Sequence, residues 1–243
     1  MSMEPKKTVL IVEDEMNIVD IVRFNLQREG YATLEAYDGE AGLALAREKK
    51  PDLILLDVMM PKMMGFDVCR ALRAEGDNVP VIILTAREEE EDKILGLEIG
   101  ADDYITKPFD PVEVLARVKS QLRRYTLLGA KPETAPERGI YTVGGVTLNE
   151  DAKSVTVDGE SVSLTPLEFN ILQLLIRSPG RIYSSSQIYE LVWNENSLGA
   201  ETSVAVHIRH LRQKIEINPS EPRYLKVVWG LGYKMEDLRH EKE

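Results

Sequence analysis

The chain has 243 residues, 43% of them hydrophobic, and a formal net charge of −11 at pH 7. This length suits one large or two ordinary domains, and the apolar content excludes wholesale disorder. The acidic balance excludes bulk attraction to polyanions, so any contact with nucleic acid must come from a local basic face.

The single cysteine, Cys69, excludes an internal disulfide and is typical of a reducing compartment. Its helical setting favours a buried small hydrophobe over a reactive thiol. The polar N-terminus lacks the apolar core of a signal peptide, and no apolar run approaches membrane-spanning length. We therefore expect a soluble, cytoplasmic protein without a membrane partner.

The first half alternates strand and helix signals. Short apolar runs predict strands at 9–12, 32–36, 53–57, 81–85 and 103–106. Apolar residues at helical spacing, capping signals and an acidic start predict helices around 18–26, 41–47 and 68–72, from 88 onward, and from Pro111 to about Arg124. Five such pairs predict an α/β fold, a doubly wound parallel sheet of five strands.

Polar side chains stand where these strands end. They are Glu13 and Asp14 after the first strand, Asp57 closing the third, Thr85 closing the fourth and Lys107 after the fifth. Because the carboxyl ends of parallel strands share one rim, we expect the five side chains to lie together. Crowded carboxylates need a cation, and an oxygen-only ligand set suits Mg²⁺. The set predicts a phosphoryl site on Asp57; solvated strand ends, or a helix cap at Asp57, are the alternative.

The motifs VEDE, LLDVMMP, LTA and ADDYITKPF resemble the receiver domain of two-component response regulators, over about the first 125 residues. The resemblance implies that Asp57 accepts phosphate from the phosphohistidine of a sensor histidine kinase. It also implies that Glu13, Asp14 and Asp57 hold Mg²⁺, with the backbone carbonyl of Met59 as a further ligand.

The same resemblance gives roles to residues beyond the acidic cluster. Thr85 and Lys107 would bind the phosphoryl oxygens, and Tyr104 would be the rotating aromatic switch. The bond from Lys107 to Pro108 is expected to be cis, which only an X–Pro bond adopts cheaply. A rival chemistry, that of phosphohydrolases, needs a second aspartate two residues after the first. Met59 stands there instead, which favours a switch over an enzyme with turnover.

A dimer face is also implied by analogy with similar regulators. Charged residues of the fourth helix and fifth strand would pair with those of the fifth helix across a symmetric homodimer: Lys93, Glu98 and Asp103 with Glu113, Arg117 and Lys119. The alternative is ordinary exposed salt bridges, each contributing about 0–1 kcal/mol.

Residues 126–139 contain two prolines and two glycines without apolar periodicity after Leu128, which predicts a linker between domains at 1–125 and 140–243. In the second domain, short strands are predicted at 146–148, 154–157 and 162–164, with Asp158-Gly159 as a hairpin turn. Capping boxes at 165–168 and 184–187 each predict a helix start, the second helix running through Trp193.

A third helix is predicted from about Thr202 to Ile217, with a narrow apolar stripe at 204, 208, 211 and 215. The opposite face and its flanks carry the candidate DNA contacts: Thr202, Val206, His207, Arg209, His210, Arg212 and Gln213. Long cationic side chains on a polar helix face suit the major groove of double-stranded DNA. A solvated helix face is the alternative.

Strand signals at 223–228 and 232–235 flank Trp229-Gly230-Leu231, so the second domain is predicted to be a winged helix-turn-helix. LTPLEF, VHIRHLRQKI and VVWGLGYK resemble the DNA-binding domain of the OmpR/PhoB subfamily, and the domain's tail looks closest to the vancomycin-resistance type. Trp229 stands where many members have a wing arginine, and it is expected either to meet DNA or to fill the base of the wing.

Together these patterns predict a transcriptional regulator, rather than an enzyme, that dimerises on phosphorylation and binds tandem DNA half-sites. Residues 193–201 would be its contact with RNA polymerase. Two alternatives remain: a phosphohydrolase that uses Asp57 covalently, and a DNA-binding protein whose receiver is only structural.

Overall fold

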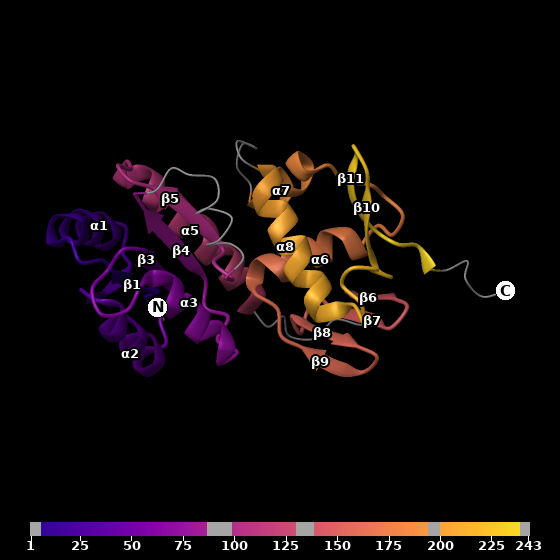
Figure 1. Ribbon diagram of the computed structural model, residues 1–243, viewed down its shortest axis with the longest axis horizontal. Helices are drawn as coiled ribbons and strands as arrows, with labels where there is room; N and C mark the ends of the chain where they lie inside the picture. Colours follow the sequence, from indigo (N-terminus) through magenta and orange to yellow (C-terminus); the bar gives the residue numbers. More distant parts are fainter. Residues whose placement is uncertain (1–5, 87–98, 130–138, 194–199, 239–243) are drawn as a thin grey trace, which may run out of the picture. The chain divides into compact units, whose positions relative to one another are not determined.

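The computed structural model describes residues 6–86, 99–129, 139–193 and 200–238. The chain divides into two compact units, Met1–Tyr125 and Thr126–Glu243, each with its own core (Figure 1). No helix in these described ranges is long and apolar enough to span a membrane.

The first unit is built on a five-stranded parallel sheet with the order β2-β1-β3-β4-β5. The strands are β1 (Thr8–Val12), β2 (Ala32–Ala36), β3 (Leu53–Asp57), β4 (Val81–Thr85) and β5 (Asp103–Thr106). β3 and β4 are buried along their whole length, which explains why they read as continuous apolar runs. The predicted fold and strand positions are confirmed.

Helices cover both faces of this sheet. They are α1 (Met16–Arg28), α2 (Gly39–Lys49), α3 (Gly65–Ala74) and α5 (Pro111–Gly129). One apolar core joins the sheet to α1 and α5, and a second joins its other face to α2 and α3. The helix predicted from residue 88 starts outside the described residues. α5 continues past Arg124 to Gly129, into the segment predicted as a linker.

The second unit starts with a four-stranded antiparallel sheet, β6 (Ile140–Val143), β7 (Val146–Asn149), β8 (Ser154–Val157) and β9 (Glu160–Val162). Three helices follow, α6 (Pro166–Ile176), α7 (Ser185–Trp193) and α8 (Ala200–Ile215). The hairpin of β10 (Leu225–Val228) and β11 (Gly232–Met235) comes last and is referred to below as the wing.

In this unit one strand was missed and the position of another was predicted wrongly. β6 was missed, because two of its four residues are exposed and its pattern is barely apolar. β9 starts at Glu160 and ends at Val162, whereas the prediction began at Val162. The Asp158-Gly159 turn has positive φ at both residues and pairs Val157 directly with Glu160, so the strand opens on polar residues.

The predicted helix starts are confirmed. Thr165 and Glu168 form a reciprocal capping box at the start of α6. At the start of α7, the Ser184 N–H donates to the Gln187 side chain at 3.0 Å, and the Gln187 N–H donates to the Ser184 hydroxyl at 3.1 Å. Each pair satisfies two backbone donors that a helix start leaves without partners.

Candidate functional site

The polar residues at the carboxyl ends of the strands meet at one rim of the parallel sheet. Asp57 and Thr85 are the last residues of the neighbouring strands β3 and β4, and Glu13 and Lys107 directly follow β1 and β5. Glu13, Asp57 and Thr85 are buried, whereas Asp14 is exposed. The parallel register therefore brings together the residues whose convergence the sequence predicts.

Three carboxylates and one ammonium form the centre of this rim. Ligand oxygens of Glu13, Asp14 and Asp57 lie within 4.8 Å of one another. The Lys107 Nζ lies 2.7 Å from Glu13 Oε2 and 3.2 Å from Asp57 Oδ1. The ammonium thus offsets part of the negative charge and links the end of β5 to those of β1 and β3.

Burial and the ion pairs act in opposite directions on these groups. Burial raises the pKa of Asp57, partly offset by the charge of Lys107, and burial likewise raises the pKa of Glu13 despite its hydrogen bond from Lys107. Burial alone would lower the pKa of Lys107, but Glu13 and the charge of Asp57 together raise it. The carboxylates therefore carry a cost of ionisation that a further cation would relieve.

This donor set fits Mg²⁺. The clustered ligands are carboxylate oxygens, two of them on buried side chains with raised pKa, and the third belongs to an exposed residue open to water. A hard divalent ion prefers such oxygens and keeps several waters of its own. Glu13, Asp14 and Asp57 are the residues that would hold it. The cis bond expected between Lys107 and Pro108 is present.

Two glycines shape the loop after Asp57, a feature that the sequence analysis missed. A Cβ on Gly65 would lie 2.0 Å from the carbonyl oxygen of Asp57, and one on Gly39 would lie 2.1 Å from that of Met63. The loop is also tied to the start of α2 by the ion pair from Lys62 to Asp38, at 2.6 Å. These contacts join residues that are not neighbours in the sequence, so no local sequence pattern predicts them.

The remaining receiver candidates are placed as follows. Tyr104 is half-buried and packs against the core on the α2 and α3 side of the sheet. Met59, two residues after Asp57, is 52% exposed. The backbone of Lys107 donates to the carbonyl of Thr85 at 2.7 Å, so these two candidates are joined through the main chain.

The described charges of the predicted dimer face pair within one chain. Arg117 donates to both oxygens of Asp103 at 2.9 and 3.0 Å and to Glu113 at 3.2 Å. Lys119 pairs with Glu29, the residue that directly follows α1, at 2.6 Å. Lys93 and Glu98 lie outside the described residues. Pairing across a dimer would therefore have to compete with these internal partners.

On α8 the exposed stripe consists of Ala205, Arg209 and Gln213, with Thr202 and His210 partly exposed. Two predicted DNA contacts are corrected, since Val206 is 6% exposed and His207 is 2% exposed. The helix is covered on a second side, where the Trp193 ring of α7 lies 5.5 Å from that of His207. The apolar stripe in the sequence predicts one buried side of α8, so it could not reveal that α7 covers a second side.

Arg212 is a third correction. It is half-buried, and its guanidinium donates from Nε and Nη2 to the carbonyl of Leu225 at 3.0 and 2.8 Å. Its donors are thereby directed to the wing rather than outward from the helix. Helical spacing gives the direction of a side chain from its own helix but not which neighbouring strand it meets.

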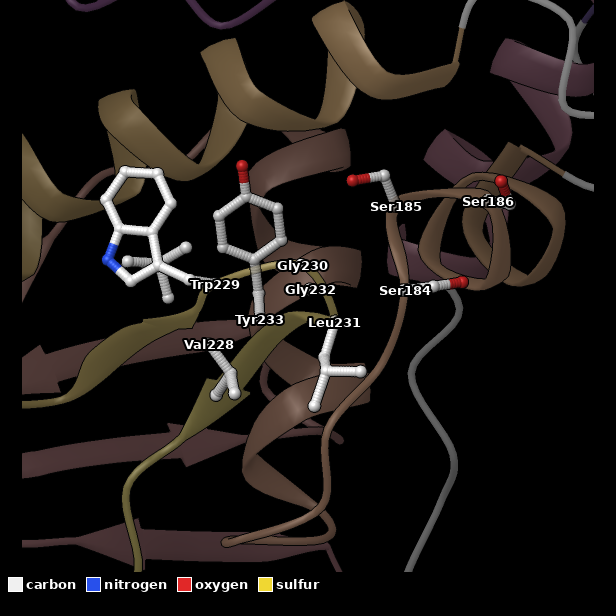
Figure 2. A pocket seen from close by; sticks show the side chains of 10 residues that line it. Ser184, Ser185, Ser186, Val228, Trp229, Gly230, Leu231, Gly232 and Tyr233 are labelled. Carbon is white, nitrogen blue, oxygen red and sulfur yellow. The ribbon is translucent and has the colours of Figure 1, made fainter.

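The wing projects Trp229, which is 89% exposed, beside Leu231 at 59%. A hollow of about 280 Å³ separates part of the wing from the start of α7 (Figure 2). Its walls are three consecutive serines and most of the wing: Ser184, Ser185, Ser186, Val227, Val228, Trp229, Gly230, Leu231, Gly232 and Tyr233. The surface of this hollow thus combines the serine hydroxyls at the start of α7 with the exposed Trp229 indole of the wing.

Two protein families match the chain. The response regulator receiver domain matches residues 9–119, and the family described as transcriptional regulatory protein, C terminal, matches residues 159–235. The first range lies within the parallel-sheet unit, and the second lies within the other unit and includes α8 and the wing.

Relatives resemble nearly the whole chain. The alkaline phosphatase synthesis transcriptional regulatory protein PhoP of Bacillus subtilis is 44% identical over 233 residues, 95% of this chain and 97% of PhoP. The sensory transduction protein RegX3 of Mycobacterium tuberculosis is 41% identical, over 94% of this chain and 99% of its own. The structure of DrrB, a Thermotoga maritima OmpR/PhoB homologue, is 31% identical, with a TM-score of 0.50 over 96% of this chain and 100% of DrrB.

Proposed function

This chain belongs to the OmpR/PhoB family of two-component response regulators, and we propose that it is switched by transfer of a phosphoryl group from a sensor histidine kinase to Asp57. The observation that carries the proposal is the cluster of Glu13, Asp14 and Asp57 with Lys107 bound to two of its carboxylates. As a family member it is a DNA-binding transcriptional regulator. Its switching, dimerisation and choice of DNA are proposals.

In the proposed transfer, a carboxylate oxygen of Asp57 forms a bond to phosphorus while the bond from phosphorus to the donor's histidine nitrogen breaks. The leaving imidazole keeps that electron pair. Lys107, 3.2 Å from Asp57, favours the ionised carboxylate and is in reach of the new phosphoryl oxygens. Thr85 offers a hydroxyl at the adjacent strand end. Mg²⁺, when bound, neutralises charge on the phosphoryl group.

We propose that the new charge draws Thr85 and Tyr104 inward and that the face containing Asp103, Glu113, Arg117 and Lys119 then favours a dimer. Phosphate can shift this equilibrium only by interacting more strongly with the active state. In a dimer, the first DNA-binding domain to bind holds the second at high local concentration, which supports binding to tandem half-sites.

For the DNA, we propose that α8 enters the major groove with Arg209 and Gln213 foremost, beside Thr202 and His210. Their support is exposure on one helix face. Trp229 would pack on the sugars of the flanking minor groove, supported by its exposure on the wing. Residues 193–201 would contact RNA polymerase.

The test of the switch is the intact mass of the full chain. The wild type and Asp57→Asn are treated with acetyl phosphate, with and without Mg²⁺. We expect one added phosphoryl group, on the wild type alone and only with Mg²⁺. No adduct on the wild type, either from acetyl phosphate or from its kinase, would leave DNA binding independent of phosphate as the better explanation.

The alternative of a phosphohydrolase is addressed by the same samples. An enzyme would release inorganic phosphate from added phosphomonoesters over many turnovers. We propose that this chain does not, because Met59 occupies the position where such enzymes carry a second aspartate. We further propose that the protein acts in the cytoplasm, where its DNA would be.

The narrower subtype is a separate proposal. The tail of the second domain resembles vancomycin-resistance regulators, whereas the relative PhoP is named for alkaline phosphatase synthesis. A genome-wide map of bound sites in the source organism would distinguish cell-wall genes from phosphate-acquisition genes.

A further inference from the structure

We propose that Arg212 and Glu216 are positioning residues that brace the wing against α8, so that the wing and the recognition helix meet DNA as one rigid unit. This inference rests on the proposed DNA-binding role of the wing. The contacts between these two side chains and the main chain of residues 223–225 are referred to below as the wing brace.

Glu216 receives three backbone donors. The N–H groups of Tyr224 and Leu225 each donate to Oε1 at 2.8 Å, and that of Arg223 donates to Oε2 at 2.7 Å. The residue is only 8% exposed. One side chain therefore holds the segment that leads into β10 by successive main-chain groups.

A charged carboxylate at this position is unfavourable unless other contacts stabilise its charge. Glu216 directly follows the last residue of α8, where the helix dipole disfavours negative charge. Its burial disfavours the charge further. Three N–H donors to a carboxylate are a strong compensating set. An apolar residue would fill this place without either cost, so the geometry points to a need for the three contacts.

Arg212 holds the same segment through a backbone carbonyl group. One helical turn before Glu216, its guanidinium donates twice to the carbonyl oxygen of Leu225. Leu225 is thus held at its C=O by Arg212 of α8 and at its N–H by Glu216, the residue that directly follows the helix. The helix itself is fixed nearby by Leu211 and Ile215, which are 0% and 2% exposed.

The second strand of the wing is held from another direction. Tyr233 and Tyr183 exchange both backbone hydrogen bonds at 2.9 Å, and a Cβ on Gly232 would lie 2.0 Å from the Tyr183 carbonyl oxygen. The hairpin is therefore held on both strands, at the start of β10 by Arg212 and Glu216 and at the start of β11, next to the turn, by Tyr183. The turn itself, with Trp229, is exposed, and these two attachments set its direction (Figure 2).

Hydrogen–deuterium exchange of the full chain tests the brace itself. We expect Glu216→Gln, which removes the charge and one acceptor, to speed exchange at least tenfold across residues 223–235 and to leave α6 unchanged. Arg212→Met is the second variant, should the first not fold. Glu221→Gln is the matched control, since this exposed side chain lies in the same connection. Unchanged exchange in the wing, or an equal increase throughout the unit, would overturn the proposal.

DNA binding tests the consequence. The probe is a labelled duplex that the wild-type chain selects from a random pool, read by fluorescence anisotropy. We expect Trp229→Ala to weaken binding of the wild type several-fold but to change binding of Glu216→Gln less than twofold, because an unbraced tip no longer reaches its contact. Equal factors in both backgrounds would overturn coupling between brace and tip.

The hydrogen–deuterium exchange and the DNA-binding experiment test the wing brace and the proposed function separately. If Trp229→Ala has no effect on the wild type while exchange still shows the wing released in Glu216→Gln, the DNA contact of Trp229 is wrong and the rigid wing stands. If the wild type selects no duplex at all, the proposed DNA-binding role fails, and exchange still decides the brace.

Discussion

At the scale of single residues, Lys107 is the group on which the receiver site converges. Its ammonium contacts Glu13 and Asp57 at once, although the two carboxylates come from different strands. In the proposed switch, neither contact is needed for a phosphoryl group to form a bond to Asp57, but both are needed for the end of β5 to respond to that bond.

Lys107→Ala should therefore accept phosphate and fail to dimerise. Intact mass would report the adduct, and sedimentation velocity would report the dimer. Lys49→Ala is the control, because this lysine lies on α2 and pairs only with its neighbour Glu48 among the described contacts. A Lys107→Ala protein that dimerises with phosphate as the wild type does would refute this role.

Cys69 illustrates a thiol that burial makes unreactive. It is fully buried on α3, and burial raises the pKa of its thiol to about 11. At pH 8 about one thiol in a thousand would then be ionised. We expect no reaction with a disulfide reagent at pH 8 in the native protein and full reaction in concentrated guanidinium chloride. Rapid labelling of the native protein would show that α3 opens.

At the scale of elements, Arg73 ties the end of α3 to the approach to β5. Its guanidinium donates to the carbonyls of Gly100 and Asp77 and to the carboxylate of Asp102, at 2.8 to 3.0 Å. Asp102 is 1% exposed and also accepts the N–H of Val81 at 2.9 Å. One cation thus holds the starts of β4 and β5 together.

Arg73→Met should lower the free energy of unfolding of the receiver by about 3–5 kcal/mol, because Asp102 would stay buried without its cation. Both tryptophans lie in the second unit, so denaturation followed by circular dichroism should shift while tryptophan fluorescence should not. Arg70→Met removes an exposed pair on the same helix and should cost at most about 1 kcal/mol. Equal shifts for both variants would contradict the argument.

The fold of the receiver could be predicted because the sequence signals for its strands and strand ends are local. Each buried strand is a continuous apolar run, and each functional group stands at a strand end, so order along the chain gave both the sheet and the convergence of Asp57, Thr85 and Lys107. The contacts of Gly39 and Gly65 with carbonyl groups elsewhere in the chain were out of reach, because nothing beside a glycine reveals what approaches it.

The second unit was less predictable for the same reason. The apolar stripe of α8 placed Arg209 and Gln213 outward, as the structure has them. It also placed Val206, His207 and Arg212 outward or at the flanks, because periodicity describes one buried side. α7 and β10 cover other sides of α8, and the sequence contains no sign of the angle at which they pack.

At the scale of the whole molecule, two units with separate cores share one chain. In the proposed function, phosphorylation acts on the first unit, and DNA is bound by the second. Because the charges of the predicted dimer face that lie in the described residues already have partners within the chain, the proposed dimerisation would have to exchange these ion pairs rather than create new ones. The gain from each exchange is small, so the dimer should depend on phosphate and be sensitive to salt.

We expect acetyl phosphate and Mg²⁺ to raise the dimer fraction of the wild type in sedimentation velocity, with no change for Asp57→Asn. Arg117→Ala should lower that fraction several-fold without reducing the phosphoryl adduct, because it removes a cation that serves Asp103 and Glu113. If Arg117→Ala dimerises as the wild type does, the interface lies on another face.

The wing brace has a consequence for how such regulators diverge. Arg212 and Glu216 hold only main-chain atoms of residues 223–225, which every amino acid except proline supplies alike. Substitutions in the turn at residues 229–231 therefore leave the wing brace intact. If the wing contacts DNA as proposed, single replacements at residue 229 would change the DNA preference without requiring a compensating change in the helix.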